Sequence, residues 1–159
     1  MNIYVLILAA LIPMVVGFIW YNPKVFGNAW MQASGMTDEK VKSGNMLAIM
    51  GISLVLSFLL AFAMQSIVIH QMGVSSIFMD PSLGKEHPDL KEFMDKYGTM
   101  FRTFKHGALH GTLAGFTLAL PILGTNAMFE RKGFKYIAVN CGYWIVTLAL
   151  MGGVICQFA

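Results

Sequence analysis

The stretch Gly17–Trp30, with the sequence GFIWYNPKVFGNAW, decides how this chain is expected to fold. It follows a long apolar run and holds two of the three tryptophans. Tryptophan and tyrosine collect at membrane–water interfaces because their rings combine an apolar body with a polar edge. Asn22 can cap a helix, and Pro23 suits the first helical position. We therefore expect this stretch to turn a membrane-spanning helix into a second helix that lies along the interface.

The composition of the whole chain agrees with a membrane location. Of its 159 residues, 57% are hydrophobic and 12% are charged, whereas a soluble domain has about 25% charged residues. The net charge of +3 is small and scattered, so nucleic acid is not an expected partner. The two cysteines, Cys141 and Cys156, would lie about 22 Å apart on one helix, too far for a disulfide. The length fits a single membrane domain over residues 1–159.

Four apolar segments are long enough to cross a bilayer, which takes about 20 helical residues. We expect spanning helices over residues 3–21, 46–72, 106–128 and 134–158. An even number of spans places both termini on one side of the membrane. The basic residues near the span ends, six in the first and third connections against five in the second, favour both termini outside the cytoplasm.

The two longer connections are expected to contain amphipathic helices that lie in the interface. Apolar residues fall on one helical face over residues 23–34, and they recur at three- and four-residue steps opposite charged residues over 88–104. We expect an irregular loop over 74–87. The predicted fold class is therefore all-α, a polytopic membrane protein with four transmembrane helices and two short amphipathic interfacial helices.

A stripe of glycines marks the third span. Gly107, Gly111 and Gly115 recur at four-residue steps, which lets the backbone of another helix approach closely. We expect this stripe to pack against a small residue of another span, either within one copy of the chain or between two copies.

Three histidines are expected near one side of the membrane. His106 and His110 are one helical turn apart, and His70 ends the second span. Three imidazoles can bind zinc, copper or iron, with Glu92 or Asp95 as supporting groups, or they can sense protons. No HExxH motif and no carboxylate within a span accompany them. The plainer interpretation, that they only form hydrogen bonds, is therefore preferred, and no cofactor is expected.

Polar residues also gather on the opposite side. An amide within the membrane needs a hydrogen-bond partner, so we expect these groups to meet, either as a structural clamp or as a site for a headgroup or small metabolite. The set consists of Trp20, Tyr21, Asn22, Asn126, Glu130, Arg131 and Asn140.

Three patterns together resemble the bacterial membrane family labelled domain of unknown function 1761. They are G-x-x-W-Y-x-P-x-x-F-G-x-x-W over residues 17–30, N-x-x-F-E-R over 126–131 and N-x-G-Y over 140–143. The resemblance implies a four-span integral protein of the bacterial inner (cytoplasmic) membrane with no established activity. The connection over 74–105 is longer than the family pattern suggests.

We expect a small, non-enzymatic membrane protein that works by association within the lipid bilayer, as a homo-oligomer or as an accessory subunit of a membrane complex. No Ser-His-Asp, CxxC or phosphate-loop pattern is present. Two alternatives stay open. The first is a pocket protein that binds or transports a lipid-like or small polar molecule, and the second is a metal or haem redox protein that uses the three histidines.

Overall fold

The computed structural model describes residues 2–78 and 87–159, and within them all regular secondary structure is helical. The elements are α1 (Ile3–Trp20), α2 (Gly27–Ser34), α3 (Asp38–Ser43), α4 (Met46–Val68), α5 (His70–Ile77), α6 (Pro88–Tyr97), α7 (Phe104–Ala114), the π-helical turn η1 (Gly115–Ala119), α8 (Leu120–Phe129) and α9 (Phe134–Phe158). Four continuous helices are long and apolar enough to cross a membrane, namely α1, α4, the α7–η1–α8 helix and α9. The prediction of an all-α membrane protein is therefore confirmed.

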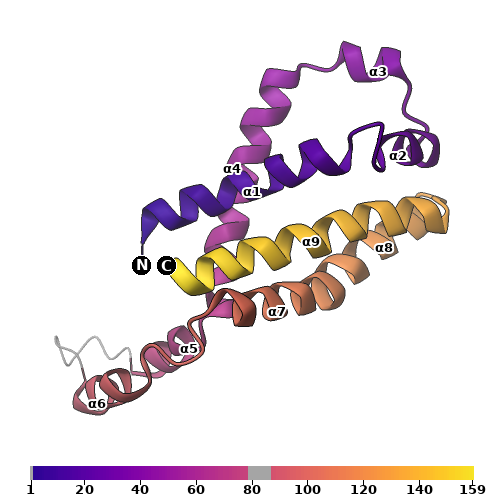
Figure 1. Ribbon diagram of the computed structural model, residues 1–159. Coiled ribbons are helices and arrows are strands. Elements are labelled where there is room, and N and C mark those ends of the chain that lie inside the picture. The colour runs from indigo at the N-terminus through magenta and orange to yellow at the C-terminus, as the bar shows by residue number, and fades with distance from the viewer. Residues whose placement is uncertain (1, 79–86) are drawn as a thin grey trace.

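Helix α9 is the centre of the bundle. It packs against α1, α4 and the α7–η1–α8 helix, and Figure 1 shows it running between α1 and the α7–α8 helix while α4 crosses them. In the most apolar 18-residue stretch of α9, 50% of the residues are buried inside the protein, whereas the corresponding share in α4 is 11%. Large apolar side chains such as Phe18 and Leu47 remain more than 80% exposed. Their exposure fits a surface covered by lipid rather than by water.

The bundle has two distinct ends. At the end that we call the terminal end, both chain termini lie at the same end of the bundle as α5 and the start of α7 (Figure 1). The guanidinium of Arg102 donates to the carbonyls of Cys156 and Ala159 there, and Cys156 Sγ donates to Val68 O at 3.3 Å. At the opposite end, which we call the hairpin end, the α1–α2 corner lies against the turn between α8 and α9 (Figure 1).

The Gly17–Trp30 corner forms, but its second helix begins later than expected. The amphipathic helix predicted over 23–34 starts at Gly27, because Asn22 caps a turn and not the helix. Asn22 Oδ1 accepts from Lys24 N at 2.9 Å, and Asn22 O accepts from the backbone N–H groups of Val25 and Gly27. A side chain at Gly27 would place its Cβ 2.3 Å from Tyr21 O, so this close turn requires glycine.

The second connection also departs from expectation. The helix predicted over 88–104 ends at Tyr97, and a turn then leads to α7. The span predicted to reach residue 72 ends at Val68, because Ile69 is extended and α5 begins at His70. Part of the loop expected over 74–87 is helical, since α5 continues to Ile77, and residues 79–86 of that loop lie outside the described residues. The break lets α5 pack against α6.

The third spanning helix contains a wider turn ahead of its proline. Residues Gly115–Ala119 are π-helical, and Pro121 follows in α8. Proline lacks an N–H group and its ring crowds the carbonyl four residues earlier. A π-helical turn accommodates such a mismatch within a helix that otherwise continues.

Candidate metal centre

Three histidines reach one point at the terminal end, and the local fold explains why. Thr103 caps α7, with its Oγ1 accepting from His106 N at 3.2 Å, so His106 lies in the first turn and His110 in the next. His70 is the first residue of α5, directly after the extended Ile69. The break between α4 and α5 thus brings a residue 36 positions earlier in the chain to the start of α7.

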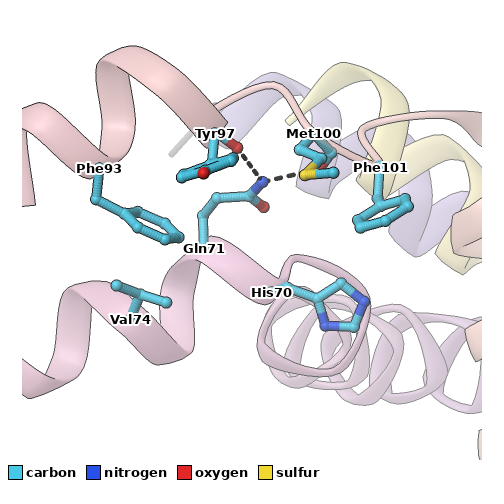
Figure 2. Close-up of a pocket in the computed structure, with 7 residues that line it drawn as sticks. All are labelled: His70, Gln71, Val74, Phe93, Tyr97, Met100 and Phe101. Atoms are coloured by element: carbon cyan, nitrogen blue, oxygen red, sulfur yellow. Dashed lines mark hydrogen bonds between the residues drawn. The ribbon is translucent and has the colours of Figure 1, made fainter.

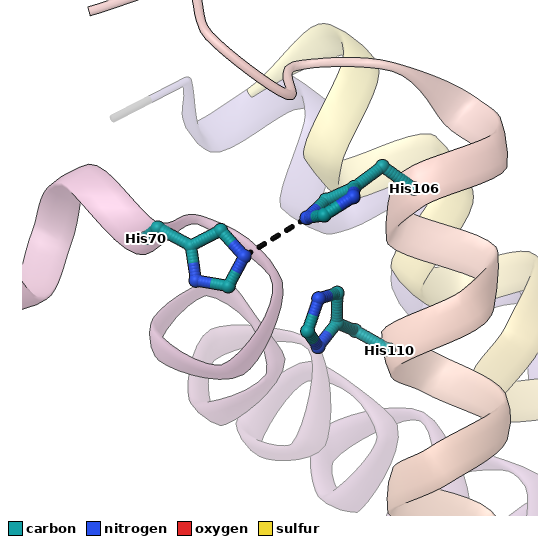
Figure 3. A group of neighbouring side chains, drawn as sticks. All are labelled: His70, His106 and His110. Atoms are coloured by element: carbon teal, nitrogen blue, oxygen red, sulfur yellow. Dashed lines mark hydrogen bonds between the residues drawn. The ribbon is translucent and has the colours of Figure 1, made fainter. Parts of the chain in front are cut away.

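The imidazole nitrogens are close enough to share one ion. One ring nitrogen from each of His70, His106 and His110 lies within 4.8 Å of the others, and His70 Nε2 lies 2.9 Å from His106 Nε2. Figure 3 shows the three rings turned toward one another from α5 and α7. Two imidazoles bound tetrahedrally to zinc place their nitrogens about 3.3 Å apart. One pair is closer than this value and every pair lies within 4.8 Å, so the three nitrogens are near enough to converge on one ion.

Phe101 holds one side of the cluster. Its ring stacks on His106 with a centroid distance of 5.0 Å and an interplanar angle of 19°, and it meets His70 edge-on. Its backbone φ is +63°, a conformation that is costly for a bulky residue. The Phe101 carbonyl accepts from Thr103 N and shares the single S–H of Cys156 with Val68 O, and these contacts retain the strained backbone. Nothing in the sequence pattern predicts this role for Phe101.

The carboxylates expected beside the histidines do not join them. Across residues 2–78 and 87–159, the only ion pair within 4.0 Å is between His87 and Asp89, so neither Glu92 nor Asp95 is paired with the cluster. His70 is exposed, and His106 and His110 are half-buried. The arrangement therefore offers three imidazoles and leaves further coordination positions open to water or another ligand, as in sites where zinc acts as a Lewis acid.

The glycine stripe is used inside the chain. A Cβ atom added to Gly107 would lie 2.2 Å from Gly152 O, and one added to Gly111 would lie 2.0 Å from Leu148 O. Gly115 approaches Ile145 in the same way, at 2.8 Å from its Cα. The stripe thus brings the backbone of α7 against that of α9, and it fixes the helix that carries His106.

At the hairpin end, part of the expected clamp forms. Trp20 Nε1 donates to Val139 O at 3.0 Å, and the Tyr21 hydroxyl donates to Asn140 Oδ1 at 3.1 Å. Asn140 Nδ2 in turn donates to Tyr136 O at 2.8 Å. Burial raises the pKa of Tyr21 above its ordinary value, so the phenol stays protonated and remains a donor. We call Trp20, Tyr21 and Asn140 the clamp.

Four of the residues predicted to join the clamp do not bond to it. Asn22 binds Lys24 N, within its own turn. Asn126 and Glu130 line a small cavity of about 150 Å³ together with Asn140, which is below the ~300 Å³ of the smallest usual ligand pockets. Arg131 is exposed with a φ of +57° at the turn after α8. Among the described residues, no hydrogen bond joins these four side chains to the clamp.

Comparison with known families agrees with the sequence patterns over residues 17–30, 126–131 and 140–143. No curated protein and no solved structure was found to match the chain. The family described as "Protein of unknown function (DUF1761)" matches residues 4–156, nearly the whole chain. The chain therefore belongs to the DUF1761 family.

Proposed function

We propose that this protein binds a divalent transition-metal ion at the terminal end, through His70, His106 and His110. One observation carries the proposal: a ring nitrogen from each of the three histidines lies within 4.8 Å of the other two. Neutral imidazole binds zinc, copper, iron and nickel. The hydrogen bond between His70 and His106 and the stacking of Phe101 on His106 already order these rings, which lowers the entropy cost of binding an ion there.

The geometry favours a single ion over haem. Haem iron takes its protein ligands along the axis perpendicular to the macrocycle. Three nitrogens within 4.8 Å of one another, two of them 2.9 Å apart, leave no room for a macrocycle between the rings. A single ion bound by three imidazoles retains an open position for a further ligand, and we assign no reaction to it.

Metal titration of the purified protein tests this proposal. The protein in lipid nanodiscs is stripped with a chelator and titrated with Zn²⁺ by calorimetry, and with Co²⁺ by visible absorption. We expect one ion per chain, and His106→Ala should weaken binding by more than about 100-fold, because even supporting residues of metal sites contribute 10–100-fold.

The fourth histidine provides the matched control. His87 pairs with Asp89 and does not belong to the cluster, so His87→Ala should bind zinc like the wild type. Equal zinc affinity of the wild type and His106→Ala would refute the proposal.

We propose as a second function that the chain associates with copies of itself or with another protein in the membrane. Its support is the outward face of α4, where Leu47, Ile52, Val55 and Leu59 are more than half exposed; this face contacts lipid in a single copy, and a second chain can replace that lipid by close packing. The glycine stripe does not contribute to this support because it packs on α9. Mass photometry in nanodiscs tests association, and a strict monomer in native lipids would contradict it.

We further propose that this membrane is the inner membrane of a bacterium. The support is the sequence resemblance to a bacterial family together with four helices of spanning length. Fractionation of the native cells tests this location, and recovery of the protein from a different membrane would contradict it.

A further inference from the structure

A mainly apolar cavity of about 300 Å³ adjoins the three histidines. It lies between α5 and α6 and the turn before α7, as Figure 2 shows. Apolar side chains make most of its wall, and the lining includes His70, Gln71, Val74, Phe93, Met100 and Phe101. Its volume reaches the lower end of the range for small-molecule pockets, about 300–1,000 Å³.

Gln71 gives this cavity one specific polar group. Its side chain is 8% exposed, and its Nε2 donates to the carbonyls of Tyr97 and Met100 at 2.9 and 2.8 Å. Two carbonyl acceptors fix which end of the amide is the nitrogen. Gln71 Oε1 is buried and, among the described residues, has no hydrogen-bond partner. Figure 2 shows the amide among the lining side chains, with the oxygen turned away from Tyr97.

A buried acceptor without a donor is unfavourable, and it is uncommon in folded proteins. Gln71 lines a cavity that is otherwise suited to an apolar body, and a small shift of the lining side chains would let a hydroxyl in the cavity reach the shielded Oε1. We propose that the cavity binds an apolar, hydroxyl-bearing molecule of the alkylphenol type, whose hydroxyl donates to Gln71 Oε1. The aromatic rings of Phe93 and Phe101 suit a flat aromatic group.

The shared residues place such a molecule beside the histidines. His70 belongs both to the cavity wall and to the cluster, and Phe101 lines the cavity while stacking on His106. The bound molecule would therefore lie next to the metal ion. This placement rests on the proposed metal binding, whereas occupation of the cavity does not require it.

Two matched ligands test the hydrogen bond. 4-Hexylphenol carries the donor, and 4-hexylanisole has the same body with a methylated oxygen. In nanodiscs, with binding followed by saturation-transfer NMR, we expect the phenol to bind about tenfold more tightly, as one neutral hydrogen bond allows. Gln71→Met should remove this preference. Equal affinities of the wild type for 4-hexylphenol and 4-hexylanisole would overturn the proposal, whether or not Gln71→Met folds.

Two valine substitutions test the location. Val74→Phe fills the cavity without altering the amide and should reduce phenol binding at least tenfold. Val15→Phe makes the same change on the outer face of α1, where Val15 is 59% exposed, and should leave phenol binding unchanged. Equal phenol binding by the two variants would show partition into lipid only and would overturn the proposal.

The same samples separate this inference from metal binding. Phenol binding is measured on chelator-treated protein and on His106→Ala, and zinc binding is measured on Val74→Phe. Phenol binding without zinc binding would refute the metal proposal alone, and zinc binding without phenol binding would refute the cavity proposal alone. Where both occur, bound Co²⁺ should broaden the phenol signals, and sharp signals would refute their adjacency.

Discussion

The polar side chains at the two ends of the bundle differ in how far their hydrogen bonds are satisfied. At the hairpin end, Trp20, Tyr21 and Asn140 each donate to or accept from another group of the chain. At the terminal end, the imidazoles of His70 and His106 bond only to each other among the described side chains, and His110 forms no hydrogen bond there.

This difference separates a structural contact from a candidate site. Polar groups that satisfy one another stabilise the fold and have little remaining capacity for a ligand. Three neutral imidazoles have three acceptor nitrogens, and the one hydrogen bond between His70 and His106 uses only one of them. The aromatic and amide residues of the hairpin end therefore act as a structural tie between α1 and α9, and the histidines are the residues available for binding.

The largest effect is expected for the close packing of α7 against α9. Both ends depend on it, because α7 carries His106 and His110 and α9 carries Asn140 of the clamp. Gly111→Ala would place a Cβ 2.0 Å from Leu148 O, which forces the α7 and α9 backbones apart and should destabilise the protein by about 3 kcal/mol, the upper end of the usual cost of overpacking. Thermal unfolding in detergent measures this. Gly124→Ala is the control, because its Cβ would meet only Ile137 Cγ2 at 3.9 Å. Equal melting temperatures for the two variants would show that this packing is wrong.

Zinc should stabilise the protein through the terminal end alone. An ion at 100 times its dissociation constant adds about 2.7 kcal/mol to the free energy of unfolding. The melting temperature should therefore rise with zinc in the wild type and in Tyr21→Phe, but not in His106→Ala. A zinc-dependent rise that survives His106→Ala would place the ion elsewhere.

The clamp is expected to contribute a smaller amount, and only to stability. A double-mutant cycle of Tyr21→Phe and Asn140→Ala isolates their hydrogen bond of 3.1 Å, which should couple the two residues by about 0.5–1.5 kcal/mol. Chemical unfolding measures the coupling, and zinc affinity should be the same in all four proteins. A coupling near zero would mean that the bond does not tie α1 to α9.

The smallest effect is expected for an amide that the sequence placed in the clamp. Asn126 is exposed and lines the small hairpin-end cavity without a bond to the clamp. Asn126→Ala should therefore change the free energy of unfolding by less than about 0.5 kcal/mol, as surface substitutions usually do. If Asn126→Ala lowered the free energy of unfolding as much as Asn140→Ala does, Asn126 would belong to the clamp.

Helix boundaries show where reasoning from the sequence worked. The last span was predicted over 134–158, and α9 covers Phe134–Phe158, since a tight turn with Gly133 limits it on one side. The amphipathic pattern over 88–104 continued past the real end of α6 at Tyr97. Periodicity alone cannot detect that end, because Phe101 adopts its positive φ only in contact with Cys156 and the histidines.

The candidate site was foreseen in its residues but not in its geometry. His106 and His110 are one turn apart in any helix, so their proximity follows from the sequence. Whether His70 joins them depends on the break at Ile69, which turns α5 toward α6. Gln71 forms its two hydrogen bonds to Tyr97 O and Met100 O only in that arrangement.

The sequence by itself determined that this is an all-helical membrane protein, because apolar runs of spanning length have no other stable structure in a bilayer. It also indicated that the chain changes direction at Gly17–Trp30, although Asn22 closes a turn and the second helix begins at Gly27 rather than at Pro23. Only the tertiary structure decided which polar residues meet. Contacts between helices depend on backbone packing, as where Gly111 lies against Leu148. That packing places the clamp at the hairpin end and the histidine cluster at the terminal end.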